Sequence, residues 1–260
     1  DQCVMASRTP FILAALLNVV VAALVLCGIV FSSPAERAEA GPSAAPSNES
    51  PAADGEDPDA ALSGTPTPAP QAADSLATLD SLAVKGRAPM TGYEREQFGQ
   101  AWSDDVTVEF GHNGCDTRND ILRRDLDNLV VKEGTHDCVA LSGTLHDPYS
   151  DEDIDFQRGA DTSSAVQIDH VVPLADAWQK GAQQWSPEQR RDFANDPRNL
   201  LAVDGPLNQQ KGAGDAATWL PPHKAYRCVY AQRIVDVKAA YGVWVTEAEK
   251  DALSRLLHAC

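Results

Sequence analysis

The stretch "QIDHVVPLADAW", residues 167–178, places an aspartate and a histidine side by side at the end of a short apolar segment. Ile168 precedes this pair and Val171-Val172-Pro173 follows it, a pattern typical of a buried strand that ends beside His170. An isolated Asp-His pair is usually no more than an exposed polar pair at a strand end. Whether Asp169 and His170 are functional therefore depends on the rest of the chain.

The segment "NDPRNLLAVDGPLNQQKGAG", residues 195–214, carries three more polar candidates. Asn199 comes directly before a short apolar run, and Asn208 and Lys211 follow a Gly-Pro turn. The spacing of Asn208 and Lys211, three residues apart, fits one turn of a helix. Together with the strand at 166–170, this order predicts a compact unit of two strands and one helix.

The side chains of this unit suit one kind of chemistry. Asp169 and Asn208 offer hard oxygen ligands of the kind that Mg²⁺ accepts while keeping several waters. His170 has an ordinary pKa of about 6.5, so it can take a proton from water, and Lys211 offers a point charge to a phosphate oxygen. Neighbouring residues of a strand point to opposite faces, so Asp169 and His170 can serve one phosphate only if the strand ends or bends at His170.

The ordered series "GCDTR", "SGTLHDPY", "IDHVVPLADAW", "FANDPRNLLAV", "NQQKG" and "WLPP", spread over residues 90–260, resembles the secreted bacterial branch of the HNH endonuclease family. The resemblance implies an α+β fold, in which a ββα-metal core is embedded in a mostly helical domain with a small antiparallel sheet. It also implies a metal-dependent endonuclease that cuts nucleic acid, DNA rather than RNA, with little sequence specificity. The alternative is a non-catalytic envelope or binding module that keeps the fold without the activity.

The resemblance also implies the role of each matching residue. It makes His170 the general base, Asp169 and Asn208 the metal ligands, and Asn199 the residue that supports the active-site loop and orients the base. Lys211 matches a basic residue often found after the last motif position. The letters here read H-N-N rather than H-N-H, and Asn208 still donates an oxygen. One divalent cation is expected, Mg²⁺ with Mn²⁺ as the alternative.

Arg118, in "GCDTRND", is a further candidate for binding the scissile phosphate, although a surface arginine at a helix start is the plainer interpretation. The chain has 38 acidic residues against 21 lysines and arginines, for a net charge of −17. Such a charge argues against bulk electrostatic binding of DNA. Contact with a polyanion must then be local and rely on a cation.

The N-terminal part predicts export. Residues 11–31 are an uncharged apolar run, so residues 1–31 indicate a signal peptide or an N-terminal membrane anchor. Residues 32–75, rich in Ala, Pro, Ser and acidic residues, predict a disordered linker. The nuclease domain is then expected over 76–260, either secreted or held outside the cytoplasm by a membrane tether. No protein partner can be deduced.

Four cysteines lie in the expected domain, and export favours their oxidation. Cys228 opens one predicted C-terminal helix and Cys260 ends the next, so a bridge between them would tie an antiparallel helix pair. Cys115 and Cys138 would then form the second bridge. Free buried thiols are the alternative.

Periodicity and capping patterns predict the remaining elements. The expected helices cover 75–86, 117–130 with Thr117 as the cap, 186–196 with Ser186 as the cap, 226–242 ended by Gly242, and 246–260 with Thr246 as the cap. The expected strands cover 138–141, 154–156, 166–170 and 199–203.

Overall fold

The computed structural model describes residues 70–260. The helices are α1 (Pro70–Ser81), α2 (Thr117–Asp125), α3 (Leu174–Gln179), α4 (Pro187–Asn195), α5 (Gly205–Lys211), α6 (Arg227–Tyr241) and α7 (Glu247–His258), joined by the 3-10 turns η1 (Arg95–Phe98), η2 (Ala182–Gln184) and η3 (Lys224–Tyr226). The strands are β1 (Leu126–Val131), β2 (Ala140–His146), β3 (Asp153–Gln157), β4 (Val166–His170) and β5 (Leu200–Asp204). This confirms the predicted α+β class.

The expected signal or anchor at 1–31 lies outside the described residues, as does the expected linker up to residue 69. Helix α1 begins at Pro70, inside the stretch expected to be linker. Among residues 70–260, every helix is too short or too polar to span a lipid bilayer.

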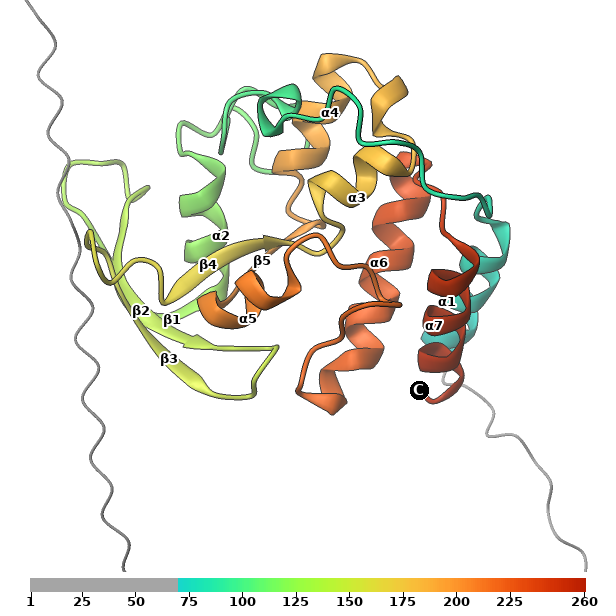
Figure 1. The fold of residues 1–260 in the computed structure, drawn as a ribbon. Helices are drawn as coiled ribbons and strands as arrows, with labels where there is room; N and C mark the ends of the chain where they lie inside the picture. Colours follow the sequence, from blue (N-terminus) through green and yellow to red (C-terminus); the bar gives the residue numbers. More distant parts are fainter. Residues whose placement is uncertain (1–69) are drawn as a thin grey trace, which may run out of the picture. The chain divides into compact units, whose positions relative to one another are not determined.

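Strands β4 and β5 form a two-stranded antiparallel sheet that carries the Asp-His pair. Asp169 lies opposite Leu201 and His170 opposite Leu200. Helix α5 follows β5 directly and packs against both strands, so the three elements form one unit near the middle of the domain (Figure 1). The predicted unit of two strands and one helix is confirmed, and β4 ends at His170.

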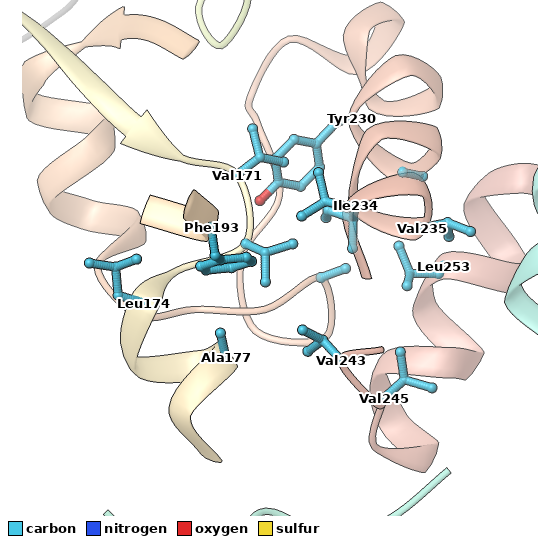
Figure 2. Close-up of a cluster of buried hydrophobic side chains, with 14 of the residues drawn as sticks. Val171, Leu174, Ala177, Phe193, Tyr230, Ile234, Val235, Val243, Val245 and Leu253 are labelled. Carbon is cyan, nitrogen blue, oxygen red and sulfur yellow. The ribbon is translucent and has the colours of Figure 1, made fainter. Parts of the chain in front are cut away.

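The β4–β5 pair lies between two hydrophobic clusters because its side chains alternate between two faces. Ile168 and Ala202 point into a small cluster with α2 and the three-stranded sheet. Leu201 and Val203 point into a larger cluster. Figure 2 shows this larger cluster, in which Val171, at the exit of β4, lies next to Tyr230 of α6. The site strand is therefore held from both sides, which suits a site that needs fixed geometry.

The second sheet is three-stranded, with antiparallel order β1-β2-β3, and lies beyond α2 (Figure 1). The predicted helix over 117–130 is wrong in its second half, because residues 126–131 form β1. There, Leu126 packs in the smaller cluster and Val131 pairs with Ala140. Branched valines suit this pleated surface, and pairing with β2 outweighs the helical periodicity.

One helix start and one helix end also differ from the sequence pattern. Asp116, not Thr117, caps α2 by accepting a hydrogen bond from the backbone of Asn119. Helix α1 ends at Ser81 rather than near residue 86, because Val84 forms a parallel bridge with Val245. The predicted caps of α4 and α7, Ser186 and Thr246, are confirmed, as is Gly242 at the end of α6.

Both predicted disulfides are present. Cys115 bridges to Cys138 with a Cα–Cα distance of 5.2 Å, and ties the loop before α2 to the start of β2. Cys228 bridges to Cys260 with a Cα–Cα distance of 5.8 Å, and joins the start of α6 to the end of the chain. Free thiols at these positions are thereby excluded.

Candidate functional site

His170 ends β4 with its imidazole held on two sides. Its Nε2 lies 2.8 Å from the carbonyl oxygen of Ala194, at the end of α4. Its ring stacks on Trp102, with centroids 6.0 Å apart and planes 14° apart. Because a carbonyl can only accept, Nε2 carries the hydrogen in the neutral ring and Nδ1 is left as the base. A backbone group thus selects the tautomer that can accept a proton.

The environment also keeps this imidazole neutral. Burial lowers the pKa of His170 to about 3, the Ala194 carbonyl opposes this, and the positive charges of Arg95 and Lys211 add to the lowering. The side chain is 8% exposed. His170 is therefore unprotonated across the whole neutral range.

Asn199 fastens the chain just after His170. Its Oδ1 accepts a 2.8 Å hydrogen bond from the backbone nitrogen of Val172, and its Nδ2 donates to the carbonyl of Val172 at 3.2 Å. The backbone of Asn199 also accepts from the nitrogen of Val171 at 2.8 Å. A wholly buried amide thus ties β4 to the start of β5. It braces the backbone that follows His170 and does not touch the ring.

Asp169 points the other way, into a buried polar cluster. Tyr149 donates a 2.6 Å hydrogen bond to Oδ2. Lys211 Nζ lies 2.8 Å from Oδ1 and 2.7 Å from Oδ2, and also 2.7 Å from the carbonyl of His170. Burial lowers the pKa of Lys211, whereas the Asp169 carboxylate acts to raise it. Lys211 is thus a buried ion-pair partner that fixes the Asp169 carboxylate and the backbone of His170.

Asn208 lies on α5, and one hydrogen bond fixes its side-chain amide. Its Nδ2 donates to Gln167 at 2.9 Å, which directs Oδ1 away from that bond. In the described part of the chain, no group of three His, Cys, Asp or Glu side chains could hold a metal ion. A cation here would rely on Asn208, on water and on the lone pairs of Asp169 that Tyr149 and Lys211 leave open. That donor set fits Mg²⁺, which takes one or two protein oxygens and keeps several waters.

Two hollows flank His170 and share three lining residues: His170, Arg95 and Leu174. One, of about 270 Å³, is polar and includes Asp169 and Asn208. We call it the polar hollow. The other, of about 190 Å³, has a mainly apolar surface, although polar side chains such as Gln100 and Asn195 also line it. We call it the apolar hollow. The polar hollow therefore gathers the predicted base and both predicted metal ligands.

Arg95 is the functional candidate that the sequence pattern missed. It lies on η1, exposed at the rim of both hollows. Within residues 70–260 no carboxylate pairs with its guanidinium, unlike that of Arg87, which lies 2.8 Å from Asp176. Its segment, "GYEREQF", places it between two glutamates and has no motif of its own, so nothing in the sequence marked it.

The structure does not bring two other predicted residues to the hollows. Arg118 lies over the ring of Phe156, 5.9 Å from its centroid, on the side of the three-stranded sheet. Lys211 lies beneath Asp169 with a fully buried side chain and lines neither hollow. Among residues 70–260, the free cation beside His170 is therefore Arg95.

A buried charge cluster anchors the segments around the site. Its centre is Lys180, fully buried, with Nζ 2.7 Å from Asp176, 2.8 Å from Asp215 and 2.6 Å from Glu249. Burial acts to lower the pKa of Lys180, but these carboxylates outweigh it and raise the pKa. The cluster joins α3, the turn after α5 and α7, so it holds the helix that follows β4 and the end of the helix that carries Asn208.

Comparisons with known proteins place the chain in a family. The model of the family "GmrSD restriction endonucleases, C-terminal domain" matches residues 116–256, which include β4, β5 and α5. A protein of Arthroderma benhamiae described as an "Uncharacterized secreted protein" is 39% identical over 200 residues, covering 75% of this chain and 89% of the relative. No solved structure matches. The chain belongs to the family of GmrSD restriction endonuclease C-terminal domains, a nuclease family of the HNH type that its motifs predicted.

Proposed function

We propose that this protein is an exported, metal-dependent endonuclease that hydrolyses phosphodiester bonds of DNA with little sequence specificity. Family membership supports a nuclease-type function. The observation that carries the proposal is the 2.8 Å bond from Nε2 of His170 to Ala194, beside a hollow that also contains Asp169 and Asn208. This bond leaves Nδ1 of an uncharged imidazole to take the proton of an attacking water.

The other side chains then have separate roles. Arg95 offers an unpaired guanidinium at the rim, able to bind two phosphate oxygens at once. Asn199 keeps the backbone after His170 in place through its two bonds to Val172. Lys211 forms a buried ion pair with both carboxylate oxygens of Asp169 and so holds this carboxylate in one orientation.

Asp169 and Asn208 would hold the divalent cation, Mg²⁺ in our proposal with Mn²⁺ as the alternative. When bound, the cation would stabilise the charge that develops on the phosphate and on the leaving oxygen. Local positive charge of this kind suits an acidic chain, because bulk attraction of DNA is absent.

Export is proposed on two grounds. The relative from Arthroderma benhamiae is described as secreted. The two disulfides of this chain suit an oxidising compartment. Whether residues 1–31 are removed or retained as a tether decides between a free and an anchored enzyme; mass determination of the exported chain answers this.

Plasmid nicking tests the proposed function. The full chain is incubated with supercoiled plasmid and Mg²⁺ or Mn²⁺, with EDTA as the metal-free arm. We expect nicking in the metal arms, no nicking with EDTA, and at least a hundredfold loss of rate in His170→Ala, since general base catalysis contributes about 10²–10⁴. His258→Ala, at an exposed histidine on α7, is the matched control. Equal cutting by His170→Ala would refute the assigned base.

The same material tests the alternative of a non-catalytic module. Calorimetric titration with Mg²⁺ and Mn²⁺ measures binding without requiring turnover. Metal binding that Asp169→Asn weakens, with no cleavage of plasmid or RNA by the intact protein, would favour the module. Cleavage that depends on the metal excludes it.

A further inference from the structure

The two hollows beside His170 differ in their chemistry. The polar hollow has Asp169 and Asn208 among its lining residues. The apolar hollow is walled by Phe98, Trp102 and Leu174. Phosphate and a hydrated cation suit the first hollow, and neither would be stable against the hydrocarbon walls of the second. The apolar hollow therefore needs a different occupant.

Size narrows the choice of occupant. The apolar hollow has a volume of about 190 Å³, below the roughly 300–1,000 Å³ of pockets that enclose a drug-sized ligand. It suits one flat ring system rather than a whole nucleotide. Its shared walls, His170 and Arg95, place such a ring directly beside the polar hollow.

Asn195 adds a polar group to this hollow. It lines the hollow at the end of α4, and its residue exposure is 1%. Its Nδ2 donates to the carbonyl of Arg191 at 2.9 Å, so the other amide atom must be the oxygen. That Oδ1 is buried without a hydrogen-bond partner. An unsatisfied buried acceptor is unfavourable, and an N–H from a ligand would relieve it.

We propose that the apolar hollow is a nucleobase subsite, which takes the base next to the scissile phosphate of the substrate strand. The proposal rests on the proposed function and extends it to the way the strand is held. The base lies against the apolar walls while Arg95 binds the phosphate at the rim. Every base has at least one N–H at its edge that can donate a hydrogen bond to Asn195 Oδ1. The subsite therefore binds the strand without sequence specificity.

Ligand binding to the metal-free full chain tests the subsite. The probes are deoxynucleoside 3′- and 5′-monophosphates, deoxyribose 5-phosphate, which lacks the base, and inorganic phosphate, each titrated calorimetrically in EDTA. We expect at least one mononucleotide to bind ten times or more tightly than deoxyribose 5-phosphate, because base contacts with aromatic walls are favourable for all bases. Equal affinities, or no binding by any probe, would overturn the subsite.

A blocking variant tests the location. Ala101 lines the apolar hollow and is exposed, so Ala101→Trp fills the hollow from its rim. Ala240→Trp, at an exposed position of α6, adds the same ring elsewhere. We expect Ala101→Trp to lose the tenfold preference for the mononucleotide and Ala240→Trp to keep it. A preference that survives in Ala101→Trp places the base elsewhere and overturns the proposal. The comparison of probes on the intact chain needs no variant, so it decides even if Ala101→Trp fails to fold.

Failure of the subsite and failure of the proposed function give different results. If plasmid is cut with Mg²⁺ but mononucleotide and deoxyribose phosphate bind equally, the nuclease stands and the subsite falls. If plasmid is not cut under any metal, the proposed function falls, whatever the probes show.

Discussion

Lys211 Nζ lies within 2.8 Å of both carboxylate oxygens of Asp169, and no part of the Lys211 side chain is exposed. The third contact of this ammonium is the carbonyl of His170. One side chain of α5 therefore holds both members of the Asp-His pair. Lys211 therefore contributes to the site mainly by stabilising the folded structure around Asp169 and His170.

We expect Lys211→Met to lower the free energy of unfolding by about 3–5 kcal/mol, because it leaves the buried Asp169 carboxylate without its partner. Chemical denaturation followed by circular dichroism measures the change. Lys132→Met, at an exposed lysine, is the control and should change stability by less than about 0.5 kcal/mol. A Lys211→Met variant as stable as the control, with reduced activity, would instead indicate a direct role at the phosphate.

Arg95→Ala should weaken substrate binding without weakening the fold. A charge-assisted hydrogen bond is worth about 1.5–3 kcal/mol, and 1.4 kcal/mol corresponds to tenfold in affinity. We therefore expect the KM for an oligonucleotide to rise at least about tenfold in steady-state kinetics. Arg95→Lys should recover part of the loss, since an ammonium keeps the charge but not the fork of donors.

The matched control for Arg95 is Arg255→Ala. Arg255 is an exposed arginine of α7, so its removal changes the net charge equally. We expect its KM to stay within about twofold of the intact protein. If both variants raise KM alike, the effect of Arg95 is one of overall charge, and no specific phosphate contact exists.

The unit β4–β5–α5 could be predicted because its signals are local. The apolar run before Asp169, the run after Asn199 and the three-residue spacing of Asn208 and Lys211 each indicate their element directly. Strand β1 could not be predicted, because its residues follow a helix without a break and become a strand only through pairing with β2. Tertiary pairing outweighs local propensity there.

The contacts of the site were predictable only in part, for a related reason. The acceptor for His170 is the backbone carbonyl of Ala194, and backbone acceptors leave no trace in side-chain identity. Arg95 reaches the hollows from a segment far from His170 in sequence, with no motif around it. Lys211 was expected at the phosphate, but its partner Asp169 is 42 residues away and pairs with it in the core. The chemical roles open to the site residues could be inferred from their side-chain types. Their hydrogen-bond and ion-pair partners could be identified only from the folded structure.

The buried charge cluster predicts acid sensitivity. Burial acts to raise the pKa of Asp176, but Lys238 and Lys180 outweigh it and lower the pKa; Asp215 is lowered in the same way, chiefly by Lys180. A folded-state pKa below the unfolded value of about 3.9 gives stability that is present above the unfolded pKa. That stability is lost as the pH falls through the folded pKa.

We expect the free energy of unfolding to decline progressively below about pH 5, measured by denaturant titration at a series of pH values. Asp215→Asn should flatten the decline, because one of the shifted carboxyls no longer titrates. Asp161→Asn, at an exposed aspartate, should leave the slope unchanged. A wild-type stability that stays constant from pH 6 to about pH 3 would contradict the role given to the cluster.

The Cys228–Cys260 bridge should stabilise the domain without shaping the site. It closes a segment of sequence separation 32, and a loop of that size is expected to contribute about 3–4 kcal/mol. The double variant Cys228→Ser/Cys260→Ser should lose about that much in denaturant unfolding. It should still nick plasmid at 25 °C, because neither Cys228 nor Cys260 lines the hollows beside His170. Reductant is the control: it should destabilise the intact protein by more than the double variant, which keeps only the Cys115–Cys138 bridge to lose. Equal stability of the double variant and the intact protein under oxidising conditions would show that the helix pair needs no covalent link.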